Sequence, residues 1–169
     1  MNALIWLSCS RNRTDTEIGM KFAKYIVKNM KEVMCMIGVL LVTHGQFCES
    51  MKESTEMVLG VQKNFYSLPL NPEDDIVCLQ SRLLNKIQEM DQGEGVIVLV
   101  DLFGGSPYNA AASCLKHAHM ECVAGMNFPM ILGILENRER VSLEDLPEIG
   151  KQSGIAGIIN VRKKIASLC

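Results

Sequence analysis

Two uninterrupted apolar runs of strand length constrain the fold of this 169-residue chain more than any other feature. The first runs from Met36 to Thr43, and the second from Val96 to Val100. Strands that are covered on both faces, as in a parallel sheet, have such continuous runs instead of alternating apolar and polar residues. Neither run approaches the roughly 20 residues that a membrane-spanning helix requires. The pattern therefore predicts two central strands of a parallel sheet.

The remainder of the chain after Met36 alternates between helix and strand patterns. Apolar spacing and capping residues predict helices over residues 47–59, from 71–73 to about 90, over 107–117 and 129–138, and after a capping box at 142–145. Shorter strands are predicted over residues 64–68, 121–126 and 154–161. Ser106 is the expected N-cap, and Pro107 the expected first residue, of the helix over 107–117. This alternation is typical of the α/β class, in which helices flank an open, mostly parallel, doubly wound sheet.

Residues 1–35 differ in character from the rest. They carry six basic and three acidic side chains, a net charge of +3, so the overall charge of −2 leaves −5 for residues 36–169. The segment fits a basic amphipathic helix or an appendage without a role. A further hypothesis is that Lys31-Glu32-Val33 reflects a bacterial ribosome-binding sequence and that the native chain starts near Met36. We therefore expect an extension of doubtful origin at 1–35, one globular domain at 36–165 and a tail at 166–169.

Polar residues follow the two strongest strands at the point where each strand ends. They are His44 and Asp101. Because ligands of parallel sheets bind beyond the carboxyl ends of the strands, we expect both side chains at one binding edge. An imidazole with one nitrogen held by a carboxylate keeps its other nitrogen free and aimed. Such a pair suits a general base, a metal ligand or a nucleophile toward phosphorus.

Other chemistries fit this sequence less well. A metal site lacks further ligands, because His117 and His119 belong to a different helix end. Acyl transfer by Ser106 is disfavoured, because the serine is not in a GxSxG elbow and the proline that follows it has no N–H for an oxyanion. A pair between Cys48 and His44 is conceivable, but a cysteine on an apolar helix face more often serves packing.

Phosphoryl chemistry fits better. Two predicted helices begin at this edge, one after His44 and one at Ser106, and helix N-termini attract phosphate. Gly104 and Gly105 allow backbone N–H groups to approach an anion. The sequence has no nucleotide-binding motif of the GxxxxGK[ST] or GxGxxG type. The plainer alternative is that His44 is an ordinary loop residue and that the glycines only lead into a helix.

Three blocks together resemble the mannose-type Enzyme IIA of the bacterial sugar phosphotransferase system. They are MIGVLLVTHG at 36–45, VLVDLFGGSPYNA at 98–110 and AGMNFPM at 124–130, and the resemblance covers about residues 36–165. It implies that His44 carries a phosphoryl group on Nε2 and that Asp101 accepts a hydrogen bond from Nδ1. It also implies that Thr43 and Ser106 help to place the group, and we add Gly105 as a phosphate-binding candidate. No metal or cofactor is expected.

The resemblance also implies partners and a location. Phosphate would come from the histidine-containing phosphocarrier protein HPr and pass to an Enzyme IIB subunit, and thence to sugar at the membrane Enzymes IIC and IID. Family members are commonly homodimers that exchange a last, antiparallel edge strand, for which Gly154–Val161 is the matching segment. The seven cysteines lack a CxxC pair, which together with the family favours a reduced, cytoplasmic protein at a permease. The charge of −2 argues against nucleic-acid binding.

Three alternatives remain open from the sequence. The chain could be the related phosphotransfer subunit of a dihydroxyacetone kinase, although the GGSP block and the NFPM turn favour the sugar-transport branch. It could be a regulatory module with the same histidine chemistry. A binding domain of flavodoxin-like shape would not be phosphorylated at all. The sequence does not identify the sugar.

Overall fold

The computed structural model describes residues 36–167 of the chain. Two units are distinguished, and the second of them, Met36–Cys169, contains every element considered below. The expectations for residues 1–35 (an amphipathic helix, an appendage or a misassigned start) lie outside the described residues. None of the helices in the described part is both long enough and apolar enough to cross a membrane.

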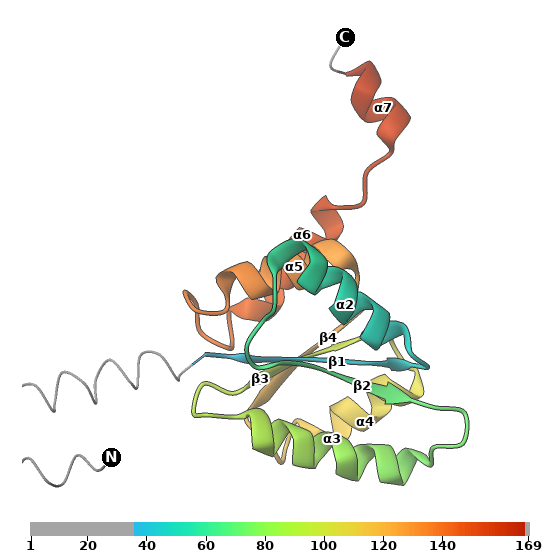
Figure 1. Cartoon of the computed structure of the whole chain (residues 1–169), viewed down its shortest axis with the longest axis vertical. Coiled ribbons are helices and arrows are strands. Elements are labelled where there is room, and N and C mark those ends of the chain that lie inside the picture. Colours follow the sequence, from blue (N-terminus) through green and yellow to red (C-terminus); the bar gives the residue numbers. More distant parts are fainter. Residues whose placement is uncertain (1–35, 168–169) are drawn as a thin grey trace, which may run out of the picture. The chain divides into compact units, whose positions relative to one another are not determined.

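A parallel sheet forms the centre of the described part (Figure 1). Its strands lie in the order β2-β1-β3-β4, and every neighbouring pair is parallel. The strands are β1 (Gly38–His44), β2 (Phe65–Leu70), β3 (Val96–Val100) and β4 (Met120–Ala124). The two continuous apolar runs of the sequence thus form the two inner strands, β1 and β3, which are buried along almost their whole length. The predicted α/β class with a parallel, doubly wound sheet is confirmed.

Helices cover both faces of this sheet, because successive strand residues point to opposite faces. The helices are α2 (Phe47–Leu59), α3 (Ile76–Met90), α4 (Ser106–Cys114), α5 (Phe128–Asn137), α6 (Leu146–Ala156) and α7 (Val161–Ala166). Val39, Leu41, Ile97 and Leu99 pack against α2, α5 and α6, while Leu40, Val42 and Val98 pack against α3 and α4. Figure 1 shows the two layers on either side of the sheet.

Helix α2 has the bounds expected from the sequence, whereas α3 begins later than predicted. The expected start at residues 71–73 is a turn, in which Asp74 Oδ2 accepts hydrogen bonds from the backbone N–H and the side-chain amide of Asn71. The same carboxylate pairs with Arg82 at 3.1 Å. These bonds hold down the pKa of Asp74, foremost through the Asn71 backbone N–H. Side-chain bonding of this kind competes with the helix, so α3 starts only at Ile76.

The start of α4 also differs from the prediction, by one residue. Gly105 occupies the N-cap position, and Ser106 is the first helical residue instead of the cap. Pro107 lies in the first turn, as expected from its missing N–H and fixed φ. The helix ends at Cys114, three residues before the predicted end.

The prediction of a last strand over Gly154–Val161 is wrong for the described chain. Residues up to Ala156 belong to α6, and a second short helix, α7, begins at Val161. The Asn127 amide donates to the backbone oxygen of Gly154 at 3.3 Å, within the last turn of α6. The β-branched residues that suggested a strand, Ile155, Ile158, Ile159 and Val161, are all exposed. A strand needs a neighbour for its ladder, and this segment has none within the described residues.

Candidate functional site

The predicted site lies where two neighbouring strands end. Strands β1 and β3 are paired in parallel up to Val42 opposite Val100. His44 and Asp101 follow these paired positions by two residues and one residue. The fold therefore brings together two side chains that are 57 positions apart in the sequence.

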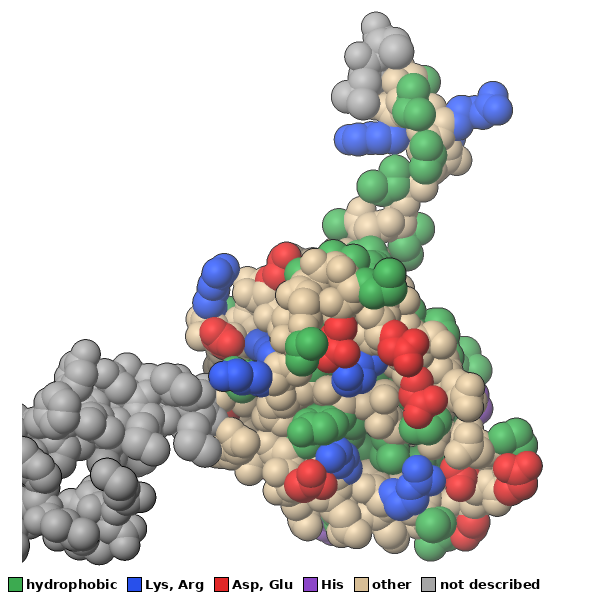
Figure 2. Space-filling model, viewed as in Figure 1, with side chains coloured by type: hydrophobic (Ala, Val, Ile, Leu, Met, Phe, Trp, Pro, Cys, Tyr) green, Lys and Arg blue, Asp and Glu red, His purple; other side chains and the backbone are tan. Residues whose placement is uncertain are grey.

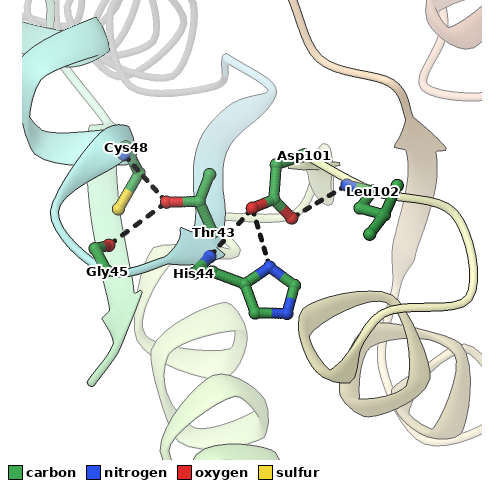
Figure 3. Close-up of polar contacts among 6 residues, drawn as sticks. All are labelled: Thr43, His44, Gly45, Cys48, Asp101 and Leu102. Atoms are coloured by element: carbon green, nitrogen blue, oxygen red, sulfur yellow. Dashed lines mark hydrogen bonds and ion pairs between the residues drawn. The ribbon is translucent and has the colours of Figure 1, made fainter. Parts of the chain in front are cut away.

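The Asp101 carboxylate is fixed by three hydrogen bonds (Figure 3). Its Oδ2 atom lies 2.9 Å from His44 Nδ1 and also accepts the backbone N–H of His44 at 2.9 Å. Its Oδ1 atom accepts the backbone N–H of Leu102 at 2.8 Å. The carboxylate thus recognises both the backbone and the ring of His44. Rotation of the ring away from Asp101 breaks one contact but leaves the other intact.

The contact with Asp101 determines which imidazole nitrogen is available. A carboxylate accepts hydrogen bonds, so the neutral imidazole places its proton on Nδ1 and leaves the lone pair on Nε2. The His44 side chain is 47% exposed, whereas that of Asp101 is 16% exposed. The arrangement therefore presents an unprotonated, accessible nitrogen on a ring that is held from behind.

Thr43 lies inside the turn and not on its open face. The residue is fully buried, and its hydroxyl accepts the Cys48 backbone N–H at 2.8 Å. The same hydroxyl donates to the Gly45 carbonyl at 3.3 Å. Thr43 therefore ties the turn after β1 to the first turn of α2. Cys48 is also buried, and this burial raises the pKa of its thiol. The Cys48 side chain belongs to the core, in agreement with the packing alternative.

The glycine turn after Asp101 leads into α4 at Ser106, directly after Gly105, which lies next to the His44 ring. The Gly105 N–H is already used, because it donates to the Leu102 carbonyl at 3.2 Å. Within residues 36–167, by contrast, neither the N–H nor the hydroxyl of Ser106 has a hydrogen-bond partner. The backbone N–H of Tyr108 is unpaired in the same part of the chain. The start of α4 therefore offers free donors for an anion, with Ser106 better placed to supply them than Gly105.

The two other histidines do not join this site. The backbone oxygen of His119 accepts from Val96 N at the beginning of β3, so His119 lies at the opposite edge of the sheet. Its Nδ1 atom is 3.6 Å from Asp91 Oδ2, which is too long for a hydrogen bond. His117 is exposed in the turn after α4, as expected for a solvated helix end.

Sequence reasoning missed two features of the site. One is the backbone N–H of Leu102 as a partner of Asp101, which depends on the local turn and leaves no signal in the sequence. The other is the exposed apolar side chain of Leu102, which precedes Phe103; the sequence places Phe103 beside the site, and its side chain is 74% exposed. The Phe103 ring packs against Tyr108, with 4.7 Å between ring centroids. The sequence did contain a signal for this feature, because two bulky apolar residues directly follow Asp101 in a predicted loop.

Comparisons with known proteins show what this chain is similar to. A family model described as "PTS system fructose IIA component" matches residues 38–149. The fructose-specific EIIA component of the phosphotransferase system (PTS) of Bacillus subtilis is 38% identical over 112 residues, which are 66% of this chain and 77% of that protein. The mannose-specific EIIAB component of Escherichia coli is 31% identical over 130 residues; the match takes in 76% of this chain but only 40% of that longer protein. Among solved structures, the mannose/sorbose-specific IIA subunit from Enterococcus faecalis superposes with a TM-score of 0.67 and 25% identity, over 75% of this chain and 95% of that one.

Proposed function

Because this chain belongs to the mannose-type EIIA family of the PTS, we propose that His44 is the residue on which it carries a phosphoryl group. The family resemblance expected from three sequence blocks is confirmed. EIIA components of this system are phosphotransferases that act with other PTS proteins in sugar uptake.

One observation supports His44 above all others. Its Nδ1 atom lies 2.9 Å from Asp101 while almost half of its side chain is exposed. A nucleophile toward phosphorus needs an unprotonated nitrogen that an incoming group can reach in line. His117 and His119 are also exposed, but neither has a carboxylate within hydrogen-bonding distance. Only the ring of His44 combines access with a held tautomer among the described histidines.

The proposed step transfers phosphorus between two nitrogens. The Nε2 lone pair of His44 attacks phosphorus, a new N–P bond forms, and the bond to the donor nitrogen breaks with its electron pair. The His44 ring becomes positively charged in this step, and the Asp101 carboxylate stabilises that charge. Positioning and charge placement supply most of the catalysis in such transfers. The reverse sequence of bond changes releases the group to the acceptor.

The start of α4 is the proposed binding site for the phosphoryl oxygens. The added group brings roughly −1.5 to −2 charges at neutral pH. The unpaired N–H groups of Ser106 and Tyr108 and the Ser106 hydroxyl are donors of the right kind. We assign Thr43 a supporting role, since its buried hydroxyl fixes the turn that carries His44.

We propose HPr as donor and an Enzyme IIB subunit as acceptor. Both exchanges require a protein to bring a reactive group directly onto Nε2. Three exposed apolar side chains close to His44 or Asp101 in sequence, Phe47, Leu102 and Phe103, offer the apolar contact that protein docking uses. This role would bring the protein to the cytoplasmic side of a sugar permease formed by Enzymes IIC and IID.

We also propose that two copies associate through their C-terminal segments. Residues 155–167 are exposed throughout and include Ile158, which is 77% exposed, as well as Ile159, Val161 and Ile165. Figure 2 shows apolar and basic side chains along this segment. The outer side of β4 is a sheet edge without a neighbour in the described chain. Removal of residues after Gly157 should convert dimers to monomers in light scattering, and a shortened chain that remains dimeric would refute exchange of this segment.

Phosphate labelling tests the proposed function directly. The protein is incubated with labelled phosphoenolpyruvate, Enzyme I and HPr, and the label should be acid-labile and alkali-stable. His44→Ala should abolish the label, whereas the matched control His119→Ala should retain it. A label that survives in His44→Ala, or one that resides on serine, would reject His44 as the carrier. Transfer from the labelled protein to an Enzyme IIB subunit separates sugar transport from a purely regulatory role.

A further inference from the structure

The glycine at position 105 is not explained by its backbone. Gly45 and Gly104 have φ values of +54° and +78°, which L-residues rarely adopt, and a Cβ atom at either position would meet nothing within 4 Å. Gly105 has φ −72° and ψ 173°, an extended conformation that any residue adopts. Its N–H is bonded within the turn, so a free amide does not explain the glycine either.

The His44 ring occupies the space where a side chain would be. A Cβ atom on Gly105 would lie 2.8 Å from His44 Cε1 and 3.4 Å from His44 Nε2. On another side it would lie 3.3 Å from the Leu102 carbonyl oxygen, which accepts the Gly105 N–H. An ordinary contact between two such atoms begins at 3.4 Å, so the His44 ring or the Cβ atom would have to shift by at least about 0.6 Å from the 2.8 Å separation. The ring can yield, but Asp101 holds it at Nδ1.

We infer that Gly105 is a positioning residue, whose bare Cα forms the seat against which Asp101 holds the His44 imidazole. Asp101 fixes the Nδ1 side of the ring, and Gly105 faces the edge formed by Cε1 and Nε2. The ring is thus held between a hydrogen bond and a steric wall, with Nε2 next to the wall. A methyl group at position 105 displaces Nε2 and strains the contact between Nδ1 and Asp101. The consequence for phosphate transfer rests on the proposed function, but the placement of the ring does not.

Two readouts test this seat without any phosphate transfer. The first is thermal unfolding of Gly105→Ala, His44→Ala and the double variant. The alanine at 105 should lower the Tm in the wild-type background and have a much smaller effect when the His44 ring is absent. The second is the imidazole ¹⁵N spectrum of His44, which should change in Gly105→Ala because the bond to Asp101 is perturbed. If Gly105→Ala does not fold, recovery of folding in the double variant supports the seat, and failure of the double variant refutes it.

Equal Tm changes in both backgrounds together with an unchanged His44 spectrum would overturn the inference. Phosphorylation by HPr provides a third, dependent readout. A displacement approaching 1 Å at a reacting group can cost on the order of a hundredfold, so we expect Gly105→Ala to slow transfer by about tenfold to a hundredfold. Wild-type protein that accepts no phosphate would defeat the proposed function, and the Tm and spectral readouts would still decide whether Gly105 seats the ring.

Discussion

The Asp101 carboxylate holds the His44 ring in place and puts a negative charge beside it. Replacement of Asp101 by asparagine separates these two effects. Oδ2 accepts both the backbone N–H and the Nδ1–H of His44, while Oδ1 accepts the Leu102 N–H. An asparagine can keep its oxygen toward His44 only by turning its amide toward the Leu102 N–H. The opposite orientation places the amide against the two His44 donors. The first orientation keeps the ring in place and loses the negative charge, so we expect a folded protein with slow phosphate transfer.

The expected loss of transfer rate follows from the replacement of a charged hydrogen-bond acceptor by a neutral one. Hydrogen bonds to charged groups contribute about 1.5–3 kcal/mol, against about 0.5–1.5 kcal/mol for neutral ones. The difference, about 1–1.5 kcal/mol at the stage where the imidazole becomes positive, corresponds to about a fivefold to twelvefold lower rate. The rate is measured as single-turnover transfer from labelled HPr in a rapid-quench experiment. The matched control is Asp91→Asn, because Asp91 lies near His119 at the opposite edge of the sheet.

Two results would refute this reasoning. A transfer rate for Asp101→Asn within twofold of wild type would mean that the charge of Asp101 has no part in the reaction. A rate as low as that of His44→Ala, in a folded protein, would mean that asparagine does not keep the ring in place. The control should transfer phosphate at the wild-type rate.

Three further predictions follow from buried or bonded groups. Thr43→Val leaves the Cys48 N–H without its acceptor in a buried turn, so it should lower the free energy of unfolding, measured in urea, by about 1–3 kcal/mol. The control Thr55→Val only removes a donor to a helical carbonyl and should lower it less. Equal losses in the two variants would contradict the role of Thr43. Burial raises the pKa of Cys122 to about 12, so iodoacetamide at pH 8 should modify the exposed Cys78 first in peptide mass spectrometry, and equal labelling of the two would contradict this. Because the pKa of Asp74 is lowered, its stabilising contribution is complete above the ordinary pKa of 3.8 and is lost as the pH falls through the lower pKa of the folded state. NMR titration of its carboxyl carbon should give a midpoint below 3.8, and a midpoint at or above 3.8 would contradict the prediction.

The inner part of the fold could be read from the sequence because its signals are strong and local. The continuous apolar residues of β1 and β3 leave no polar face, so both strands had to be covered on two sides. Once both are parallel neighbours, the carboxyl ends that carry His44 and Asp101 meet at one edge. The contact between these two side chains was therefore predictable without coordinates.

Other features depended on contacts that the sequence does not display. The bond from the His44 backbone N–H to Asp101 depends on how the chain turns after β1. The late start of α3 results from Asp74 bonding to Asn71 and Arg82 instead of serving in a helical turn. The segment after Gly154 has the composition of a strand, but composition alone does not supply a neighbouring strand. In each case the outcome depends on a contact that is made or missing in the folded chain, and not on local propensity alone.

The pairing of β1 with β3 has a consequence for the protein while it is being synthesised. His44 leaves the ribosome long before Asp101, and no residue between them supplies the carboxylate. Until the third strand has emerged and docked beside the first, the imidazole has no partner to select its tautomer. An unfinished chain therefore lacks the reactive centre even where its first strand and helix have formed. On the proposed function, the chain can therefore accept phosphate only after the centre of its sheet is complete.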